Sequence, residues 1–150
     1  MLATMDLAMA DTTIALYDAK YYKPLWRPVT AIELGVPAAS PPVPAHPTWK
    51  PLTPTAADPS YPGAHSALST SAAEVLTAFY GPEQPVTVTA TAATPMSRTF
   101  PNLATAAQEA GLSRIWAGQH TRLDHNAGQQ LGRQVAAQAL AALPAAPNAR

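Results

Sequence analysis

The most specific candidate for chemistry is a group of ionisable residues in the last third of the chain. His120 and Asp124 are four residues apart, so both side chains would lie on one face of a helix. The Asp124 carboxylate could then accept a hydrogen bond from one imidazole nitrogen and leave the other unprotonated and nucleophilic. Arg114 could reach the same ligand only if the backbone bends before His120, for which Gly118 is a natural place. An ordinary helical ion pair is the alternative interpretation.

A second group consists of two cations near the N-terminus, Lys20 and Arg27. Their separation is almost two helical turns, so both could face one point. The neighbouring aromatic residues Tyr21, Tyr22 and Trp26 favour partial burial of this segment. A solvated basic edge is the alternative interpretation.

A third group, residues 62–66, stands at the start of the clearest helical pattern. Free backbone N–H groups at a helix N-terminus attract anions, and the small residues Gly63 and Ala64 allow an oxyanion to approach closely. His65 then lies where an acid or base could reach a bound oxyanion. A histidine after an ordinary proline turn is the alternative interpretation.

Helices must position these groups, because alanine is in large excess over β-branched residues and the 17 prolines oppose a β-sandwich or barrel. Apolar spacing predicts an all-α fold, with helices over residues 2–22, 29–34 and 64–80 in the first half of the chain. The inward residues expected in the first and last helices are Leu2, Met5, Met9, Leu16, Tyr17 and Tyr21, and Leu123, Ala127, Leu131 and Val135.

Two more helices are expected in the second half of the chain. Asn102 can cap one that runs through Ala110 and ends at Gly111. Ser113 can cap a last helical region that continues to Pro144. The remaining expectations are a short strand or extended loop over residues 86–91 and a frayed tail over residues 145–150.

Residues 37–62 contain nine of the prolines and are predicted to form neither a regular helix nor a central strand. Trp49, Leu52 and Tyr61 are anchors that flexible linkers usually lack. We therefore expect an ordered, extended loop that wraps the helical core, with a disordered linker as the alternative.

Composition limits the classes of function. With 150 residues the chain suits one modest core. Nine Lys and Arg balance nine Asp and Glu, so no basic field is available for nucleic acid or an anionic membrane. Cysteine is absent, and no apolar run approaches the roughly 18 residues of a membrane span. The first residues lack a basic region and include Asp6, so they do not resemble a signal peptide.

Taken in order, these groups match a known pattern. Lys20-x6-Arg27-Pro28, Pro62-x-x-His65 and Ser113-Arg114-x5-His120-x3-Asp124 resemble the three-part signature of the vanadium-dependent haloperoxidase and type 2 phosphatidic acid phosphatase superfamily. The flanking segments WRPVTAI, TPTAADPSYPGAHS and AGLSRIWAGQHTRLD are similar to its bacterial vanadium haloperoxidase-like branch. The resemblance extends from about Leu7 to Ala142.

The resemblance implies an all-helical bundle in which His120 is the metal ligand of vanadate and Asp124 orients His120. His65 would be the acid or base at the apical oxygen. Lys20 would also polarise hydrogen peroxide. The oxyanion would be bound by the side chains of Lys20, Arg27 and Arg114 and by the backbone of Gly63 and Ala64.

The implied activity is a vanadate-dependent peroxidase that oxidises halide with hydrogen peroxide to hypohalous acid. Phosphate could occupy the same site, so a phosphatase in which His120 attacks a phosphoester is an alternative. A truncated domain that binds an oxyanion without turnover is a third. Export is common among such bacterial relatives, so the resemblance implies an exported or periplasmic protein.

Two departures from the family pattern matter. Gly63-Ala64 stands where the family has Ser-Gly, so restoring the serine by Gly63→Ser is expected to strengthen oxyanion binding. Family members are also much longer, so residues 1–150 are expected to be a single domain, the C-terminal, site-bearing portion of a longer architecture. Without the preceding helices, apolar faces of residues 2–22 and 123–140 would be exposed.

Overall fold

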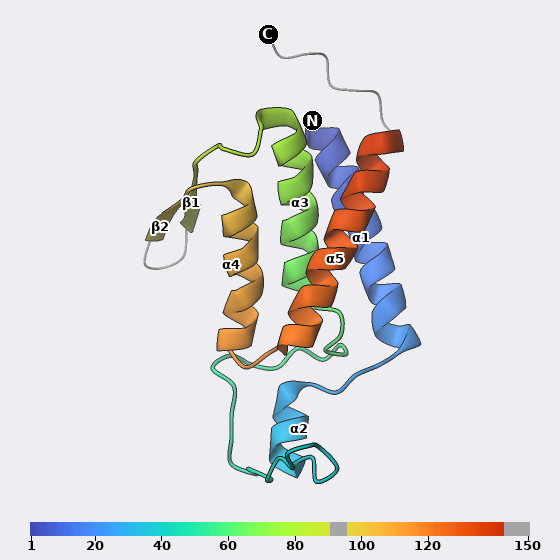
Figure 1. Ribbon diagram of the computed structural model, residues 1–150, viewed down its shortest axis with the longest axis vertical. Coiled ribbons are helices and arrows are strands. Elements are labelled where there is room, and N and C mark those ends of the chain that lie inside the picture. Colours follow the sequence, from blue (N-terminus) through green and yellow to red (C-terminus); the bar gives the residue numbers. More distant parts are fainter. Residues whose placement is uncertain (91–95, 143–150) are drawn as a thin grey trace.

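The computed structural model describes residues 1–90 and 96–142, and most of this part of the chain is a bundle of helices (Figure 1). The expected all-α fold class is confirmed. The predicted helix end at Pro144 and the predicted tail at 145–150 lie outside the described residues. The elements are α1 (Leu2–Tyr22), α2 (Pro28–Leu34), α3 (Ala64–Tyr80), β1 (Val86–Ala90), β2 (Met96–Phe100), α4 (Leu103–Trp116) and α5 (Arg122–Ala142).

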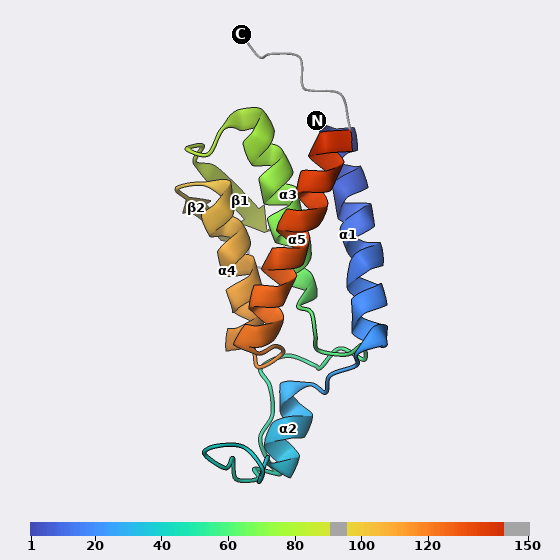
Figure 2. The same ribbon diagram turned by 45° about the vertical axis from the view of Figure 1, so that its right-hand side comes forward.

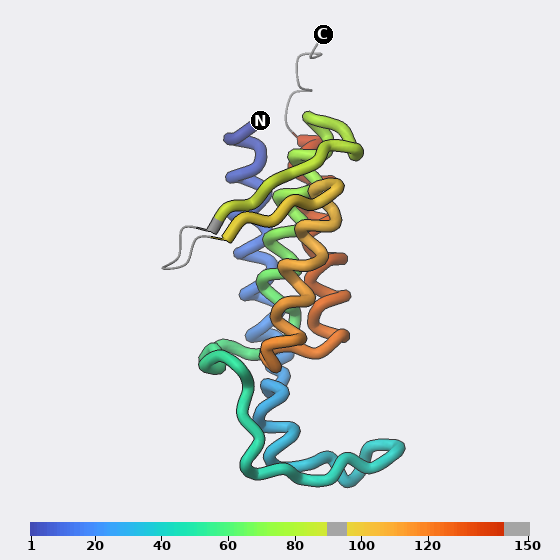
Figure 3. The backbone as a smooth tube through the Cα atoms, turned by 90° about the vertical axis from the view of Figure 1, so that its left-hand side faces the viewer, coloured from blue at the N-terminus to red at the C-terminus, as the bar shows by residue number. Residues whose placement is uncertain are grey.

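The helix α3 lies at the centre of the bundle and packs against α1, α4 and α5 (Figures 1 and 2). The predicted end of α1 before Pro24 is confirmed, and α2 begins at Pro28, where a proline is favourable because the first helical N–H has no partner. Beyond one end of the bundle lie α2 and the loop after it, from which the chain returns to α3 (Figure 3). No described helix is both long and apolar enough to cross a membrane.

Glycines bring α5 against the central helix. A Cβ on Gly128 would overlap the Gly63 carbonyl oxygen, and a Cβ on Gly132 would overlap that of Ala67. The predicted inward stack at 123–135 is therefore wrong at Leu123, which is 61% exposed, while Ala127, Leu131 and Val135 are half-buried. The close contact selects the glycine face and leaves these side chains beside it. The buried residues of α5 are Asp124, His125, Gly128, Gly132, Ala136 and Ala139.

The buried face of α1 is also narrower than predicted. The Thr12 hydroxyl lies 3.0 Å from Ser71 Oγ of α3, so the two helices meet partly through small polar groups. Leu16 is the one predicted inward residue of α1 that is buried, while Leu2, Tyr17 and Tyr21 are exposed and Met5 and Met9 half-buried. The residues that are buried lie at four-residue intervals and are Ala8, Thr12, Leu16 and Lys20.

The helix α4 is longer than predicted. Its N-cap is confirmed, because Asn102 Oδ1 accepts a hydrogen bond from the Thr105 N–H at 2.9 Å. The predicted end at Gly111 is wrong. Gly111 is buried within α4, where a Cβ would come within 2.6 Å of Ser66 Oγ, so its small size serves packing rather than termination. Ser113 consequently lies inside α4 and caps no helix.

A β-hairpin lies on the outer side of α4. The predicted strand over 86–91 is β1, which pairs antiparallel with β2, and Val86 lies opposite the buried Phe100. Position 91 lies outside the described residues. The sequence did not indicate β2 because Met96–Phe100 lacks an alternating apolar pattern.

The proline-rich segment 37–62 contains no helix. This segment contacts the end of the bundle partly through backbone hydrogen bonds. The Leu52 N–H, for example, donates to the Ala117 carbonyl at 3.1 Å. The Leu52 side chain, expected to be an anchor, is 82% exposed. Trp49 and Tyr61 are half-buried.

Candidate active site

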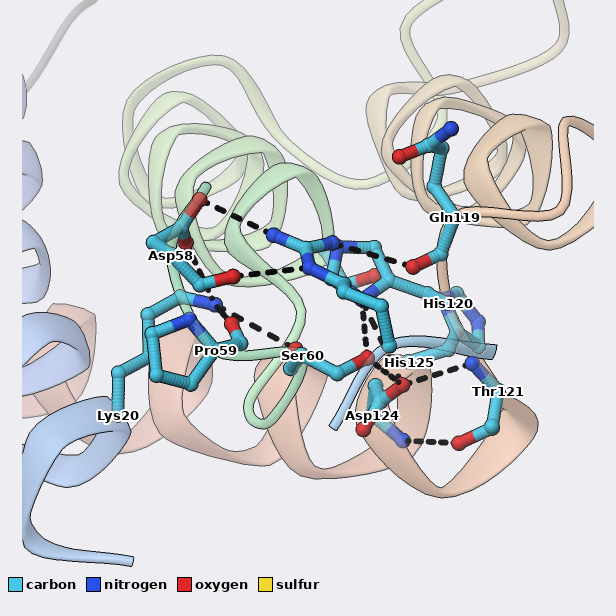
Figure 4. A network of polar contacts seen from close by, with 11 residues as sticks. Lys20, Asp58, Pro59, Ser60, Gln119, His120, Thr121, Asp124 and His125 are labelled. Atoms are coloured by element: carbon cyan, nitrogen blue, oxygen red, sulfur yellow. Dashed lines mark hydrogen bonds and ion pairs between the residues drawn. The ribbon is translucent and has the colours of Figure 1, made fainter. Parts of the chain in front are cut away.

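Residues far apart in the sequence meet at the end of the bundle nearest α2 (Figure 4). Lys20 belongs to the last turn of α1, Arg27 directly precedes α2, and His120 lies in the connection between α4 and α5. Arg27 Nη1 lies 3.4 Å from His120 Nε2. Lys20 Nζ and Arg27 Nη2 both contact the carboxylate of Asp58, at 2.9 and 3.0 Å. The fold thus brings the cations Lys20 and Arg27 and the histidine His120 into one buried polar cluster.

His120 and Asp124 meet through a capping turn. Thr121 directly precedes α5, and its N–H donates to Asp124 Oδ2 at 2.7 Å, while the Asp124 N–H donates to Thr121 Oγ1 at 3.3 Å. This reciprocal arrangement follows the capping-box pattern, with aspartate as the acidic residue. It holds Asp124 Oδ2 3.5 Å from His120 Nδ1. The expectation that both residues share a helix face is wrong, because His120 precedes the helix.

Ser60, from the proline-rich segment, completes the surroundings of the Asp124 carboxylate. Its hydroxyl donates to Asp124 Oδ2 at 2.7 Å and lies 3.4 Å from His120 Nδ1. Burial alone would raise the pKa of Asp124, but the hydrogen bonds from His120, Thr121 and Ser60 outweigh it and lower this pKa to about 2. Asp124 is therefore ionised at neutral pH.

The two partners of the imidazole favour one tautomer of His120. Nδ1 faces the ionised Asp124 carboxylate, which can only accept, and Nε2 faces the Arg27 guanidinium, which can only donate. The proton therefore belongs on Nδ1, and Nε2 keeps its lone pair. His120 itself is buried, so a ligand of Nε2 would be partly shielded from water.

Arg27 and Lys20 are held mainly by the loop residues around Asp58. Arg27 Nε donates to the Asp58 carbonyl at 2.9 Å and Nη1 to the Gln119 carbonyl at 3.1 Å. Lys20 Nζ also contacts the carbonyls of Pro59 and, at 3.4 Å, Ser60. Burial lowers the pKa of Lys20, and the hydrogen bond that Lys20 donates to Asp58 offsets this only in part.

Burial would raise the pKa of the Asp58 carboxyl, but the Lys20 hydrogen bond and the charges of Lys20 and Arg27 lower it below its ordinary value. Asp58 is therefore an ionised partner of both cations at neutral pH.

Arg114 and His65 lie beside this cluster. Arg114 comes from the last turn of α4, and among the described residues its buried Nε has no hydrogen-bond partner. The predicted backbone bend is present, since Gly118 has φ +76° in the connection that follows. His65 is exposed in the first turn of α3. Partial burial lowers the pKa of His65, and the charges of Arg114 and His120 lower it further, so His65 is neutral at pH 7.

The start of α3 differs from the expectation at Gly63. The Gly63 N–H donates to the backbone carbonyl of Asp124 at 2.9 Å, so it joins α3 to α5 and is not a free donor for an oxyanion. A Cβ on Gly63 would lie 3.1 Å from the same carbonyl oxygen. Ala64 is the first residue of α3, where the backbone N–H is directed out of the helix end.

Sequence reasoning missed three polar residues of this region. Asp58 and Ser60 come from a loop without periodicity, so no spacing rule could place them beside His120. His125 is buried, and its Nδ1 lies 2.8 Å from Ser66 Oγ. The T-x-x-D pattern at 121–124 is a visible capping signal that could have located the start of α5.

Almost the whole chain matches one known protein family. The sequence model of the VCPO second helical-bundle domain matches residues 1–147. The chain belongs to this vanadium haloperoxidase family. No curated protein matches it significantly.

Among solved structures, the chain is similar to that of the first bacterial vanadium-dependent iodoperoxidase. The two share 29% sequence identity, with a TM-score of 0.81 over 94% of this chain. A holo-type bacterial vanadium-dependent chloroperoxidase shares the fold at 21% identity and a TM-score of 0.73 over 91% of this chain. The chain spans about a third of either protein, 32% and 34% of their lengths.

The polar cluster at the end of the bundle pairs a histidine with cationic side chains. In residues 1–90 and 96–142, no group of three or more His, Cys, Asp or Glu side chains is placed to hold a metal ion. One imidazole nitrogen of His120 faces the Arg27 guanidinium, and the backbone N–H of His120 donates to the Arg114 carbonyl at 3.3 Å. Among the described residues, the buried Arg114 Nε has no hydrogen-bond partner. An imidazole nitrogen beside a guanidinium suits an oxyanion such as vanadate or phosphate.

Proposed function

We propose that the chain carries the vanadate site of a peroxidase that oxidises halide with hydrogen peroxide to hypohalous acid. The observation that carries this proposal is the pairing of His120: Nδ1 faces an ionised carboxylate while Nε2 keeps its lone pair beside Arg27. A neutral, oriented imidazole of this kind is a suitable metal ligand. We also propose that residues 1–150 are the site-bearing domain of a longer architecture.

Vanadate, when bound, would supply Lewis acidity toward peroxide without changing its own oxidation state. His120 would hold it through Nε2, and Asp124 and Ser60 would keep the imidazole in its tautomer. Arg27 and Arg114 would neutralise the oxyanion. In the net reaction the peroxide O–O bond breaks, halide loses two electrons, and one proton is consumed to give hypohalous acid and water.

His65 would handle the proton. Its neutral form can accept a proton from hydrogen peroxide as the peroxide binds, and the protonated form can return one to the oxygen that leaves as water. Its exposed place in the first turn of α3 connects that proton transfer to solvent. Lys20 would polarise the peroxide once its present partners release it.

Vanadate-dependent halogenation of a dye tests the proposal. The chain is expected to halogenate only when vanadate, peroxide and halide are all present, and His120→Ala should abolish both this activity and vanadate retention in equilibrium dialysis. His46→Ala, an exposed histidine of the proline-rich segment, is the matched control and should change neither. Undiminished vanadate retention by His120→Ala would contradict the assignment.

A phosphatase is the second candidate, favoured by the same lone pair on His120 Nε2, which could attack a phosphoester as a nucleophile. The His120-phosphate bond would form as the bond to the ester oxygen breaks and that oxygen takes a proton from solvent water. Neutral His65 could then accept a proton from the water that attacks the His120-phosphate bond and releases phosphate. Hydrolysis of an aryl phosphate without halogenation would favour this activity. Vanadate retention with neither activity would leave an oxyanion-binding domain.

A further inference from the structure

The carboxylate of Asp58 is paired with two cations that the proposed site would need for an oxyanion. It contacts Lys20 Nζ at 2.9 Å and Arg27 Nη2 at 3.0 Å, so one anionic group already bridges two of the three candidate oxyanion-binding cations. The close-up shows Asp58 and Lys20 side by side and joined by a dashed contact, on the side of the network away from His120 (Figure 4). Neither the peptide carbonyls nearby nor the Asp124 carboxylate makes such a bridge.

The donors of Lys20 are fully used in this arrangement. An ammonium group has three N–H donors, and Lys20 Nζ has three oxygen partners, which are Asp58 Oδ2 and the carbonyls of Pro59 and Ser60. Lys20 is also completely buried. An oxyanion could therefore gain a hydrogen bond from Lys20 only if Asp58 or a carbonyl withdrew.

Asp58 is the partner best placed to withdraw. Its side chain remains 20% exposed, whereas Lys20 is completely buried and Arg27 nearly so. Asp58 and the residues next to it form neither helix nor strand, so a local rearrangement there would disturb few backbone hydrogen bonds.

The charge of Asp58 affects which anions the two cations can bind. Lys20 and Arg27 contribute two positive charges, and Asp58 cancels one of them. An incoming dianion must therefore overcome twice the repulsion from Asp58 that a monoanion of the same shape meets.

We propose that Asp58 is a specificity-determining residue, an internal anion that competes with the oxyanion for Lys20 and Arg27 and biases the site against highly charged oxyanions. The proposal rests on the proposed oxyanion site but not on turnover. It assigns to Asp58 a role in selecting the charge of the ligand, in addition to holding the two cations.

Two tetrahedral probes of different charge test this at one neutral pH, namely sulfate, a dianion, and perrhenate, a monoanion. Calorimetric titration should show that Asp58→Asn tightens sulfate binding on the order of tenfold or more and perrhenate binding by clearly less. Glu33→Gln is the matched control, because it removes one carboxylate from an exposed ion pair with Lys50. It should leave both affinities unchanged.

Asp58→Asn leaves two cations without their carboxylate partner, so this variant could fold poorly. Thermal melting with each anion is therefore the second measurement. Sulfate should then raise the melting temperature of Asp58→Asn more than that of the wild type. The corresponding difference between variant and wild type should be smaller with perrhenate. Equal sulfate-to-perrhenate ratios in wild type and Asp58→Asn, or no preferential rescue by sulfate, would overturn the proposal.

The outcomes separate this inference from the proposed function. A shifted anion preference in a chain that neither retains vanadate nor halogenates would support the role of Asp58 and contradict the peroxidase. Vanadate-dependent halogenation with an unchanged anion preference in Asp58→Asn would support the peroxidase and overturn the role of Asp58.

Discussion

At the scale of single residues, the candidate site depends on which groups are charged. Asp124 stays ionised because its hydrogen bonds are stronger than the cost of its burial, and this fixes the proton of His120 on Nδ1. The identities of His120, Asp124, Arg27 and Lys20 were recognisable from spacing. Their actual partners were not, because Asp58 and Ser60 reach them from a loop that no periodic pattern describes.

The low pKa of Asp124 predicts a pH dependence of stability. A pKa of about 2 in the folded chain against an ordinary 3.8 means that the stabilisation is complete above about pH 4 and lost as the pH falls toward 2. The amount is on the order of 2 kcal/mol. Urea unfolding at about pH 5 and pH 2 should show that Asp124→Asn removes this pH-dependent part. Asp6→Asn, at an exposed position of α1, should retain it. An equal loss of unfolding free energy between about pH 5 and pH 2 in wild type and Asp124→Asn would contradict the low pKa of Asp124.

His65 should affect turnover more than binding. It is exposed and neutral at pH 7, so its removal deletes a proton acceptor without leaving a buried cation unpaired. His65→Ala is expected to lower halogenation about 100-fold or more while vanadate retention in equilibrium dialysis changes little. His65→Ala with full halogenation activity would refute the role in proton transfer.

At the scale of elements, helix positions followed from the sequence better than helix contacts did. Apolar periodicity was sufficient to place α1 and α3, and the cap at Asn102 was sufficient to place the start of α4. The inward faces were misassigned because hydrophobicity favours large side chains, whereas the close approach of α5 to α3 requires Gly128 and Gly132. Gly111 was misread as a helix end because glycine often follows a helix, whereas here its small size allows close packing inside α4.

The junction between α3 and α5 gives a prediction that reverses an expectation from the family pattern. Gly63→Ser would place a Cβ 3.1 Å from the Asp124 carbonyl oxygen, a backbone atom held by the Gly63 N–H. We therefore expect a loss of about 1–3 kcal/mol in the free energy of unfolding, and no gain in oxyanion affinity.

Chemical denaturation and vanadate dialysis measure the two effects of Gly63→Ser. Ala78→Ser, at an exposed position of α3, is the control for introducing serine and should change neither quantity appreciably. A serine variant of undiminished stability that binds vanadate more tightly would restore the original expectation.

At the scale of the whole molecule, the candidate site joins segments that are otherwise separate. Lys20, Arg27, Asp58 and His120 come from α1, the start of α2, the proline-rich segment and the connection between α4 and α5. The start of α1 lies at the opposite end of the bundle (Figure 1). Assembly of the site therefore requires most of the fold, which is why a linear pattern could name its members without supplying its geometry.

This arrangement predicts that an oxyanion stabilises the whole chain. The unfolded chain cannot present these segments together, so a ligand at 100 times its dissociation constant should add about 2.7 kcal/mol to the free energy of unfolding. Phosphate, followed by thermal melting at constant ionic strength, is a suitable probe. Arg114→Ala should weaken the stabilisation, because it removes a cation whose buried Nε lacks a partner among the described residues. Arg133→Ala, which disrupts an exposed pair with Glu74, should preserve it. Equal stabilisation of Arg114→Ala and wild type would place phosphate elsewhere on the molecule, away from Arg114 and the proposed shared site.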